Sequence, residues 1–179
     1  MLGFVGSLKP WHGVDLLAET FRRLATNDPR LHLLVVGEGP GARHVEALAA
    51  ELPGRVTRVG PVPQSQVASY LRAMDIAVAP YPRLDRFYYS PLKVLEYMAT
   101  GRAVVASEIG QVSKLIRHQE TGVLVPAGAP AELADAIAGL AADGPLRRRL
   151  GAAAAAEVKR QHLWTHRVDR ILALRSAAA

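Results

Sequence analysis

The fold is decided by the stretch Tyr88-Tyr89-Ser90-Pro91-Leu92-Lys93-Val94-Leu95-Glu96-Tyr97-Met98-Ala99-Thr100-Gly101, which predicts a helix. Ser90 is a good N-cap residue, Pro91 suits the first helical position, and Gly101 is the residue type that commonly follows a helix C-terminus. The apolar runs 75–80 and 103–107 flank this helix and are typical of buried parallel strands. The helix is therefore expected to begin just past the carboxyl end of a strand, where open α/β sheets bind their ligands.

The start of this helix favours an anion. Its first N–H groups lack helical partners, and the positive end of the helix dipole lies near Ser90. Lys93 and Glu96 are three residues apart and share one face of the helix. A cation beside bound phosphate and a carboxylate one turn further along suit the diphosphate and the ribose hydroxyls of a nucleotide. The local pattern leaves open an alternative, an amphipathic helix with a solvated Lys–Glu pair.

Short apolar runs alternate with helical patterns along the whole chain. Strands are expected at 2–5, 31–36, 56–59, 75–80, 103–107 and 122–126, and helices at about 13–25, 42–52, 64–73, 90–101, 112–117, 130–142, 145–162 and 165–174. This alternation predicts an α/β fold, a Rossmann-like doubly wound parallel sheet of about six strands with helices on both faces and C-terminal helices that pack back. Trp164 is expected to pack the last of these helices.

The composition excludes several classes of protein. The 179 residues suffice for one domain, and 50% of them are hydrophobic. The absence of cysteine excludes disulfides and thiolate chemistry, and the six histidines show no metal-ligand spacing, so no metal is expected. No apolar run reaches the roughly 18 residues of a membrane span, and no signal peptide is apparent. A net charge of +6 suits an anionic ligand, whereas 6% aromatic residues disfavour nucleic acid as a partner.

Glycine-rich loops follow the first two expected strands. Gly6 and Gly13 bracket the first loop, which either approaches a phosphate or makes tight turns without a ligand. His12 in this loop either donates to a phosphate or caps the next helix. The turn at Gly37 and Gly39 favours contact with a base or ribose edge, although turn geometry alone explains it nearly as well.

Five segments, taken in order, resemble the C-terminal half of the family 4 glycosyltransferases. They are Phe4-Val5-Gly6-Ser7-Leu8-Lys9-Pro10-Trp11-His12-Gly13-Val14-Asp15, Val35-Val36-Gly37-Glu38-Gly39-Pro40, Gly60-Pro61-Val62, the helix at 90–101 and Glu120-Thr121-Gly122-Val123-Leu124-Val125. The resemblance implies the two-domain GT-B architecture, in which this half binds the nucleotide-sugar donor and the preceding half holds the acceptor. It also implies transfer with retention of anomeric configuration and without a metal.

The resemblance implies roles for individual residues. Glu96 matches the second Glu of the family's Glu-x7-Glu motif, which binds the donor ribose, whereas Tyr88 stands where the family has the first Glu. Ser7 and His12 replace a basic pair that neutralises the diphosphate in the family. The expected catalytic residues are cations or donors at the leaving group: Lys93 foremost, then Lys9 and His12. The expected donor-binding residues are Gly6, Ser7, Gly37, Gly39, Val62, Ser90, Pro91, Leu92 and Glu96.

The expected function is therefore that of the donor domain of a retaining glycosyltransferase. A UDP- or GDP-sugar is the expected donor, the acceptor is open, and no cofactor is needed. Residues 1–179 correspond to this half alone, so the acceptor domain is expected to be absent and the isolated chain to transfer sugar poorly or not at all. The alternatives are a non-catalytic nucleotide-binding or interaction module and, with less support, a nucleotide-sugar epimerase domain, for which the chain shows no convincing carboxylate pair.

The sequence also gives expectations for the location of the chain, its self-association and its contact with membranes. A cytoplasmic location is expected, and a cleft face left uncovered by the acceptor domain favours self-association. The C-terminal segment is basic, which is interpreted first as a solvated helix face, with peripheral contact to anionic lipid at the inner face of the membrane as the alternative. Its basic residues are Arg147, Arg148, Arg149, Lys159, Arg160, Arg167, Arg170 and Arg175.

Overall fold

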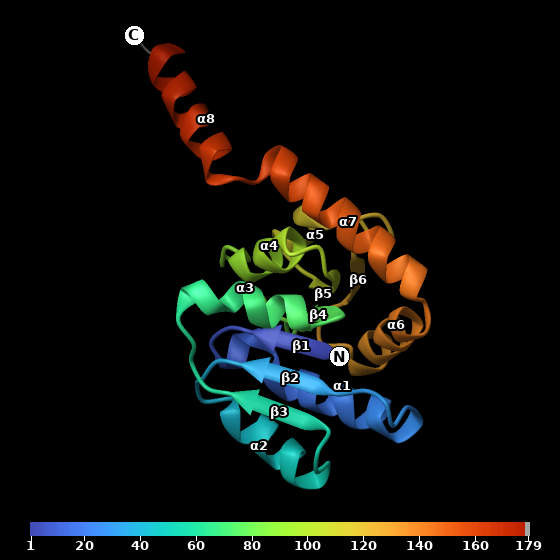
Figure 1. Cartoon of the computed structure of the whole chain (residues 1–179). Helices are drawn as coiled ribbons and strands as arrows, with labels where there is room; N and C mark the ends of the chain where they lie inside the picture. The colour runs from blue at the N-terminus through green and yellow to red at the C-terminus, as the bar shows by residue number, and fades with distance from the viewer. Residues whose placement is uncertain (178–179) are drawn as a thin grey trace.

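Six parallel strands form one sheet at the centre of the computed structural model, which describes the backbone of residues 1–177 and the side chains up to residue 174 (Figure 1). The strands are Leu2–Val5 (β1), Leu33–Val36 (β2), Val56–Val59 (β3), Ile76–Ala79 (β4), Ala103–Glu108 (β5) and Val123–Pro126 (β6). Their order in the sheet is β3-β2-β1-β4-β5-β6. The order reverses between β1 and β4, so the expected doubly wound topology is confirmed and its switch point lies between these two strands.

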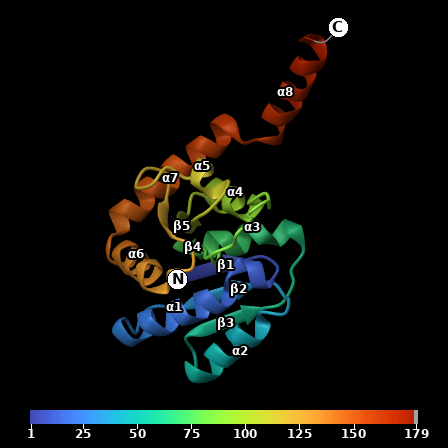
Figure 2. The ribbon, with the colours of Figure 1, turned by 180° about the vertical axis from the view of Figure 1, so that it is seen from behind.

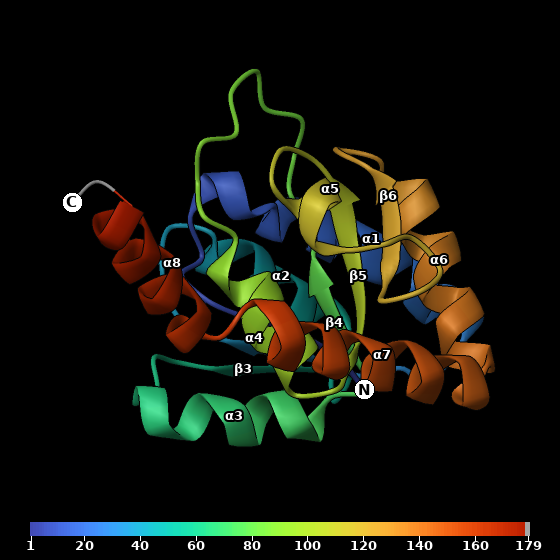
Figure 3. The same cartoon turned by 90° about the horizontal axis from the view of Figure 1, so that it is seen from above.

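Helices cover both faces of this sheet, as expected. Their bounds are Pro10–His12 (η1, a 3₁₀ helix), Val14–Asn27 (α1), Ala42–Glu51 (α2), Gln64–Ala73 (α3), Leu92–Ala99 (α4), Val112–Leu115 (α5), Pro130–Ala142 (α6), Gly144–Gln161 (α7) and Trp164–Ala177 (α8). One apolar core lies between the sheet and α1, α2 and α6, and a second lies between the sheet and α3, α4, α5 and α7 (Figure 3). No helix within the described residues is long and apolar enough to cross a membrane.

The two cores follow from the period of two along each strand. On β1, Phe4 faces the core under α1 whereas Val5 faces the core under α4. On β5, Val105 and Val104 divide between the cores in the same way. Strands that are buried on both faces need apolar residues at nearly every position, which is why the sequence showed continuous apolar runs rather than an alternation.

The C-terminal helices differ from each other. α7 packs back on α4, placing Ala154 and Val158 in the core on that face. α8 instead extends away from the domain (Figure 2), and the Trp164 side chain at its start is 77% exposed. The expectation that Trp164 packs the last helix is therefore wrong, because α7 already covers the face to which α8 would return. The side chain of Arg175, counted in the basic segment, lies outside the described residues.

Candidate functional site

A crevice opens at the carboxyl end of β1, where the switch point lies. β1 pairs with β4 only at its amino end, through Leu2 and Gly3. At Val5 the buried hydroxyl of Tyr97 on α4 takes the place of the neighbouring strand, because it accepts from the Val5 N–H and donates to the Val5 carbonyl, both at 2.9 Å. Burial raises the pKa of Tyr97, so the hydroxyl stays neutral and can do both. Tyr97 thus supplies hydrogen bonds to the backbone of Val5 at the point where β1 and β4 separate.

A cavity of about 300 Å³ lies in this crevice. The loops after β1, β2 and β3 contribute to its wall, together with the start of α3 and one face of α4. Its lining residues are Val5, Gly6, Ser7, Val36, Gly37, Glu38, Pro61, Val62, Gln64, Val67, Lys93 and Glu96.

Glycines bring the backbones of the first two loops together beside the cavity. Gly37 has φ +128°, and a Cβ there would lie 2.1 Å from the carbonyl oxygen of Gly6. Gly6 has φ +145°, and a Cβ there would lie 2.9 Å from Nζ of Lys93. Both φ values lie in a region that residues with a side chain rarely adopt, and at both positions a Cβ would clash with a neighbouring atom. The structure therefore bears out the tight turns, which bring the backbone of Gly6 next to Nζ of Lys93, and the contact of these glycines with a ligand stays a prediction.

The ammonium of Lys93 is the most unusual group in the cavity. Nζ is buried and has no hydrogen-bond partner among the described residues. It lies 4.3 Å from the centroid of the Phe4 ring, a cation–π contact, and beside Gly6. Burial lowers the pKa of Lys93 to about 7, and the carboxylate of Glu96 offsets only part of this effect. A buried cation without a partner is costly, and an anion in the cavity would supply the partner that the protein lacks.

Glu96 lies one helical turn beyond Lys93 on the same face of α4. Its Oε1 accepts a hydrogen bond of 3.2 Å from Nε2 of Gln64, at the start of α3. This single bond orients the carboxylate toward the cavity that both residues line. Its remaining acceptor positions suit a pair of hydroxyl groups.

The start of α4 differs from the expectation. The helix begins at Leu92, Pro91 precedes it as the N-cap, and no side chain caps it, so the assignment of Ser90 as N-cap and Pro91 as first helical residue is wrong. Pro91 has φ −81° and ψ +58° and is the centre of an inverse γ-turn, in which the N–H of Leu92 donates to the carbonyl of Ser90 at 2.9 Å. The N–H of Val94 donates to the carbonyl of Pro91. Two of the first amides are therefore already paired, and the cation of Lys93 rather than a set of free N–H groups makes this end attractive to an anion.

The first loop holds His12 and Lys9 differently from the expectation. Nδ1 of His12 donates to the carbonyl of Ser7, so the ring braces the loop instead of lining the cavity. Burial, followed by the nearby Lys93 ammonium, lowers the pKa of His12, against the opposing effect of the Ser7 hydrogen bond. Lys9 is exposed and lines a separate hollow between η1 and α2. Of the three candidate catalytic residues, Lys93 alone lines the cavity.

The cavity brings together some of the predicted donor-binding residues and leaves others outside. Those that line it are Gly6, Ser7, Gly37, Val62 and Glu96. Those that do not line it are Gly39, Ser90, Pro91 and Leu92. Gly39 instead packs against the backbone of Leu8, and the side chain of Leu92 is 52% exposed.

Sequence reasoning missed Gln64 and Tyr97. Gln64 opens α3 directly after a Gly-Pro turn, at the carboxyl end of a strand, and this position was a usable signal. Tyr97 was read only as part of the helix pattern. Its signal was the hydroxyl itself, because a tyrosine on the buried face of a helix needs a hydrogen-bond partner.

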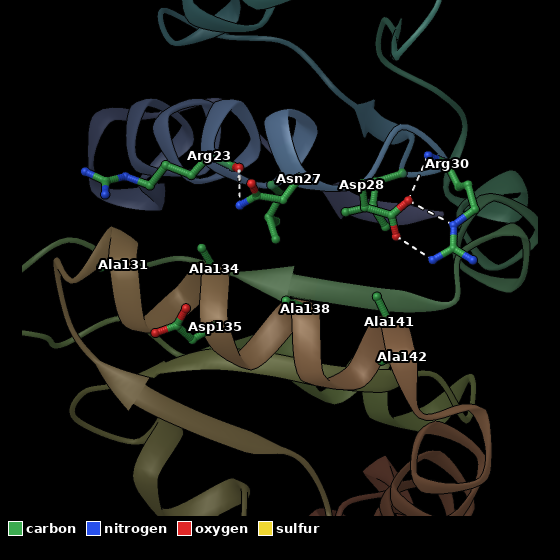
Figure 4. Close-up of a pocket in the computed structure, with 12 residues that line it drawn as sticks. Arg23, Asn27, Asp28, Arg30, Ala131, Ala134, Asp135, Ala138, Ala141 and Ala142 are labelled. Carbon is green, nitrogen blue, oxygen red and sulfur yellow. Dashed lines mark hydrogen bonds and ion pairs between the residues drawn. The ribbon is translucent and has the colours of Figure 1, made fainter.

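A second hollow of about 300 Å³ lies between α1 and α6, on the face of the sheet that these helices cover (Figure 4). Alanines of α6 form one wall, and three of the charged residues that line it, Arg23, Asp28 and Arg30, are held in ion pairs. Arg30 binds both carboxylate oxygens of Asp28, and Arg23 pairs with Glu19. No unpartnered buried polar group of the described chain faces this hollow. The crevice at the switch point is therefore the candidate functional site.

Comparison with known proteins identifies the family to which this chain belongs. The family model described as "Glycosyl transferases group 1" matches residues 1–143, and the chain belongs to this family. The D-inositol 3-phosphate glycosyltransferase of Nocardia farcinica is 33% identical over 190 residues, which cover 99% of this chain and 40% of that protein. The chain thus spans about 40% of the length of such relatives.

Solved structures match the fold. The C-terminal domain of the group 1 glycosyltransferase LpcC from Francisella tularensis superposes with a TM-score of 0.80 at 23% identity, covering 91% of this chain and 86% of that domain. HepE from Anabaena, in complex with UDP, superposes with a TM-score of 0.82 at 23% identity, covering 98% of this chain and 48% of HepE. The fold is that of the C-terminal domain of GT-B glycosyltransferases, and the resemblance on which the sequence analysis rested is confirmed.

Proposed function

We propose that this chain is the donor-binding domain of a retaining glycosyltransferase and that the cavity at the switch point binds a nucleoside diphosphate sugar. The observation that carries the proposal is the buried ammonium of Lys93, which faces the glycine loop with no partner among the described residues. A dianionic diphosphate is the ligand chemistry that this group lacks. Its oxygens would receive the three N–H bonds that Lys93 can donate.

Lys93 also fits the chemistry of transfer. The bond between the anomeric carbon and the β-phosphate oxygen breaks, and negative charge grows on the leaving diphosphate. A cation held in a site of low dielectric stabilises that charge far more than a solvated one does. Because burial lowers the pKa of Lys93 to about 7, the lysine takes up a proton when the diphosphate binds at higher pH. Lys93 thereby fills the role of the basic pair that Ser7 and His12 replace.

The placement of the ribose and the base follows from the order of side chains along α4. Glu96 lies one turn beyond Lys93, next to Gln64, and accepts hydrogen bonds from the ribose hydroxyls. Beyond it, Pro61 and Val62 of the loop after β3 offer apolar surface and main-chain groups to the base. The diphosphate, ribose and base thus extend from Lys93 toward α3.

The comparisons support this proposal. HepE binds UDP on the same fold, and related structures of it contain UDP-glucose or UDP with glucose. The D-inositol 3-phosphate glycosyltransferases are enzymes of sugar transfer that are much longer than this chain. We propose that the acceptor site belongs to a further domain of the same architecture, and that transfer by this chain alone is weak or absent.

The test is a calorimetric titration of the chain with UDP, GDP and ADP, beside Glu96→Ala. Removing a carboxylate that bonds the ribose is expected to cost about 1.5–3 kcal/mol, a loss of roughly ten- to over a hundredfold in affinity. The matched control is Glu132→Ala, which removes an exposed carboxylate from the first turn of α6, outside this cavity.

Two outcomes decide the proposal. Binding of one nucleotide that weakens in Glu96→Ala and persists in Glu132→Ala supports it and identifies the base. At pH 8 the heat of binding should also vary with the ionisation enthalpy of the buffer, because Lys93 gains a proton. Absence of binding by all three nucleotides to a folded sample, or equal affinity in both variants, would refute the site.

A further inference from the structure

The cavity at the switch point contains one charged residue that the proposed function leaves without a role. Three ionisable side chains line this cavity, those of Lys93, Glu96 and Glu38. The first two are assigned to the diphosphate and the ribose. The carboxylate of Glu38, in the loop after β2, forms no hydrogen bond or ion pair with another described residue. Both of its oxygens are therefore available to accept hydrogen bonds from a ligand.

The backbone of Glu38 is held in place by the two neighbouring loops. The N–H of Leu8, in the loop after β1, donates to the carbonyl of Glu38 at 2.8 Å. The N–H of Gly37 donates to the carbonyl of Gly60, in the loop after β3, at 3.2 Å. Gly39 follows with φ +145° and packs against the backbone of Leu8. The carboxylate thus starts from a fixed point of the cavity wall, which lowers the entropy cost of binding a ligand.

The position of Glu38 indicates which part of a nucleotide it contacts. Because β2 lies between β1 and β3, the loop of Glu38 lies between the loop of Gly6, which is next to Lys93, and the loop after β3. A carboxylate repels a diphosphate, so Glu38 suits a part of the nucleotide that carries N–H or O–H donors. The ribose hydroxyls are assigned to Glu96 on α4. The base is the part that remains, and it is placed at the loop after β3.

We propose that Glu38 binds the Watson–Crick edge of guanine and that the donor is a guanosine diphosphate sugar, an inference that rests on the proposed function of the cavity. Guanine presents two donors side by side, the ring N1–H and the amino group at C2. The two oxygens of one carboxylate accept from such a pair at once, as they do from the fork of an arginine. Each oxygen of Glu38 then has a partner.

The other bases do not present this pair of donors. Uracil has a single N–H between two carbonyl oxygens, and these oxygens repel a carboxylate. Adenine has its amino group beside a ring nitrogen that is itself an acceptor. Repulsion of the wrong ligand adds to attraction of the right one, so a single carboxylate discriminates strongly between these bases. UDP keeps the contacts of its diphosphate and ribose and therefore binds to the same cavity more weakly than GDP.

Calorimetric titration of the wild-type chain with GDP, IDP, ADP and UDP tests the inference. Inosine diphosphate is the most informative probe, because its base has the size and the N1–H of guanine and lacks only the amino group. GDP should bind roughly five- to hundredfold more tightly than IDP, the range expected for a paired contact to a base edge. ADP and UDP should bind more weakly than GDP by at least the same factor.

Two substitutions separate recognition of the base from the general effect of charge. Glu38→Ala removes a negative charge and changes the affinity for every diphosphate alike, so the ratio of GDP to IDP affinity is free of that effect, and the preference for GDP should disappear. Glu38→Gln replaces one acceptor by a donor, which fits an N–H beside a carbonyl in guanine, hypoxanthine and uracil alike, so the preference should shrink. Glu132→Ala, at an exposed carboxylate of α6 outside the cavity, is the matched control and should keep the preference.

The outcomes separate this inference from the function on which it rests. A preference for GDP over IDP that disappears in Glu38→Ala and persists in Glu132→Ala supports the assignment of Glu38 to guanine. Equal affinity of the wild-type chain for GDP and IDP, tighter binding of UDP than of GDP, or a preference for GDP that survives Glu38→Ala overturns it and leaves the cavity as a nucleotide site. Failure of the wild-type chain to bind any of these nucleotides overturns both.

Discussion

Replacing Lys93 with methionine should stabilise the free protein while removing its affinity for diphosphate. A pKa lowered from 10.5 to about 7 corresponds, at about 1.36 kcal/mol per pH unit, to a penalty of about 5 kcal/mol on the charged lysine. Attractions of the charged form, such as the cation–π contact with Phe4, are already contained in this net shift. Methionine keeps the apolar stem of the side chain and carries no charge. We therefore expect Lys93→Met to raise the free energy of unfolding at pH 6 by up to about 5 kcal/mol.

The stability gain of Lys93→Met should decrease as the pH rises. Between pH 7 and 10.5 the unfolded chain holds a proton on Lys93 that the folded chain has lost, so this lysine makes the wild-type protein more stable as the pH rises. Below pH 7 both states are protonated and the penalty is present in full. The advantage of Lys93→Met is therefore largest below pH 7 and declines toward zero by about pH 10.

Urea denaturation of wild type and Lys93→Met at pH 6, 7, 8, 9 and 10 measures this difference. Lys9→Met is the matched control, because Lys9 is exposed and lies outside the cavity, and it should change stability little at any pH. In Lys93→Met the pKa of His12 should rise, since the Lys93 ammonium helps to lower it, and NMR titration of the ring reports this. Lower stability of Lys93→Met at pH 6, or an advantage that does not change with pH, would refute the reasoning.

Three further substitutions test the parts that build the site. Tyr97→Phe leaves the N–H and carbonyl of Val5 without their buried partner and should cost about 2–4 kcal/mol of stability in urea denaturation; a cost under ~0.5 kcal/mol would contradict the role of the hydroxyl. Gly37→Ala forces a Cβ against a backbone carbonyl at positive φ and should cost about 3 kcal/mol or more, visible as a lower denaturation midpoint. Gln64→Ala removes the bond that orients Glu96 and should weaken UDP binding about two- to fivefold in calorimetry, with stability unchanged.

Most of the fold was accessible from the sequence because its strands are short, apolar and separated by glycines and prolines. The strand β2 and residues 103–106 of β5 have no polar residue, and the six strands were found within a few residues of their bounds. The course of α8 was not accessible. Trp164 and the apolar residues after it look like core residues in a helical pattern, and local periodicity does not reveal that α7 already occupies the available face.

The site was predicted in part, and the division has a physical basis. Lys93 and Glu96 were found because helical spacing fixes which side chains share a face. The start of α4 was predicted one residue too early. A proline is equally suited to the first helical position and to an inverse γ-turn just before the helix. The unpartnered state of Lys93 depends on how Phe4 and Gly6 pack around it. That packing is a tertiary property, which a single sequence does not display.

The most direct test of the account is a crystal structure of the chain with UDP bound. The account predicts density for the diphosphate in the crevice at the switch point, with an oxygen at roughly 2.7–3.0 Å from Nζ of Lys93 and the ribose hydroxyls on Glu96. A nucleotide bound elsewhere, or bound in the crevice with Nζ of Lys93 still unpartnered, would contradict it.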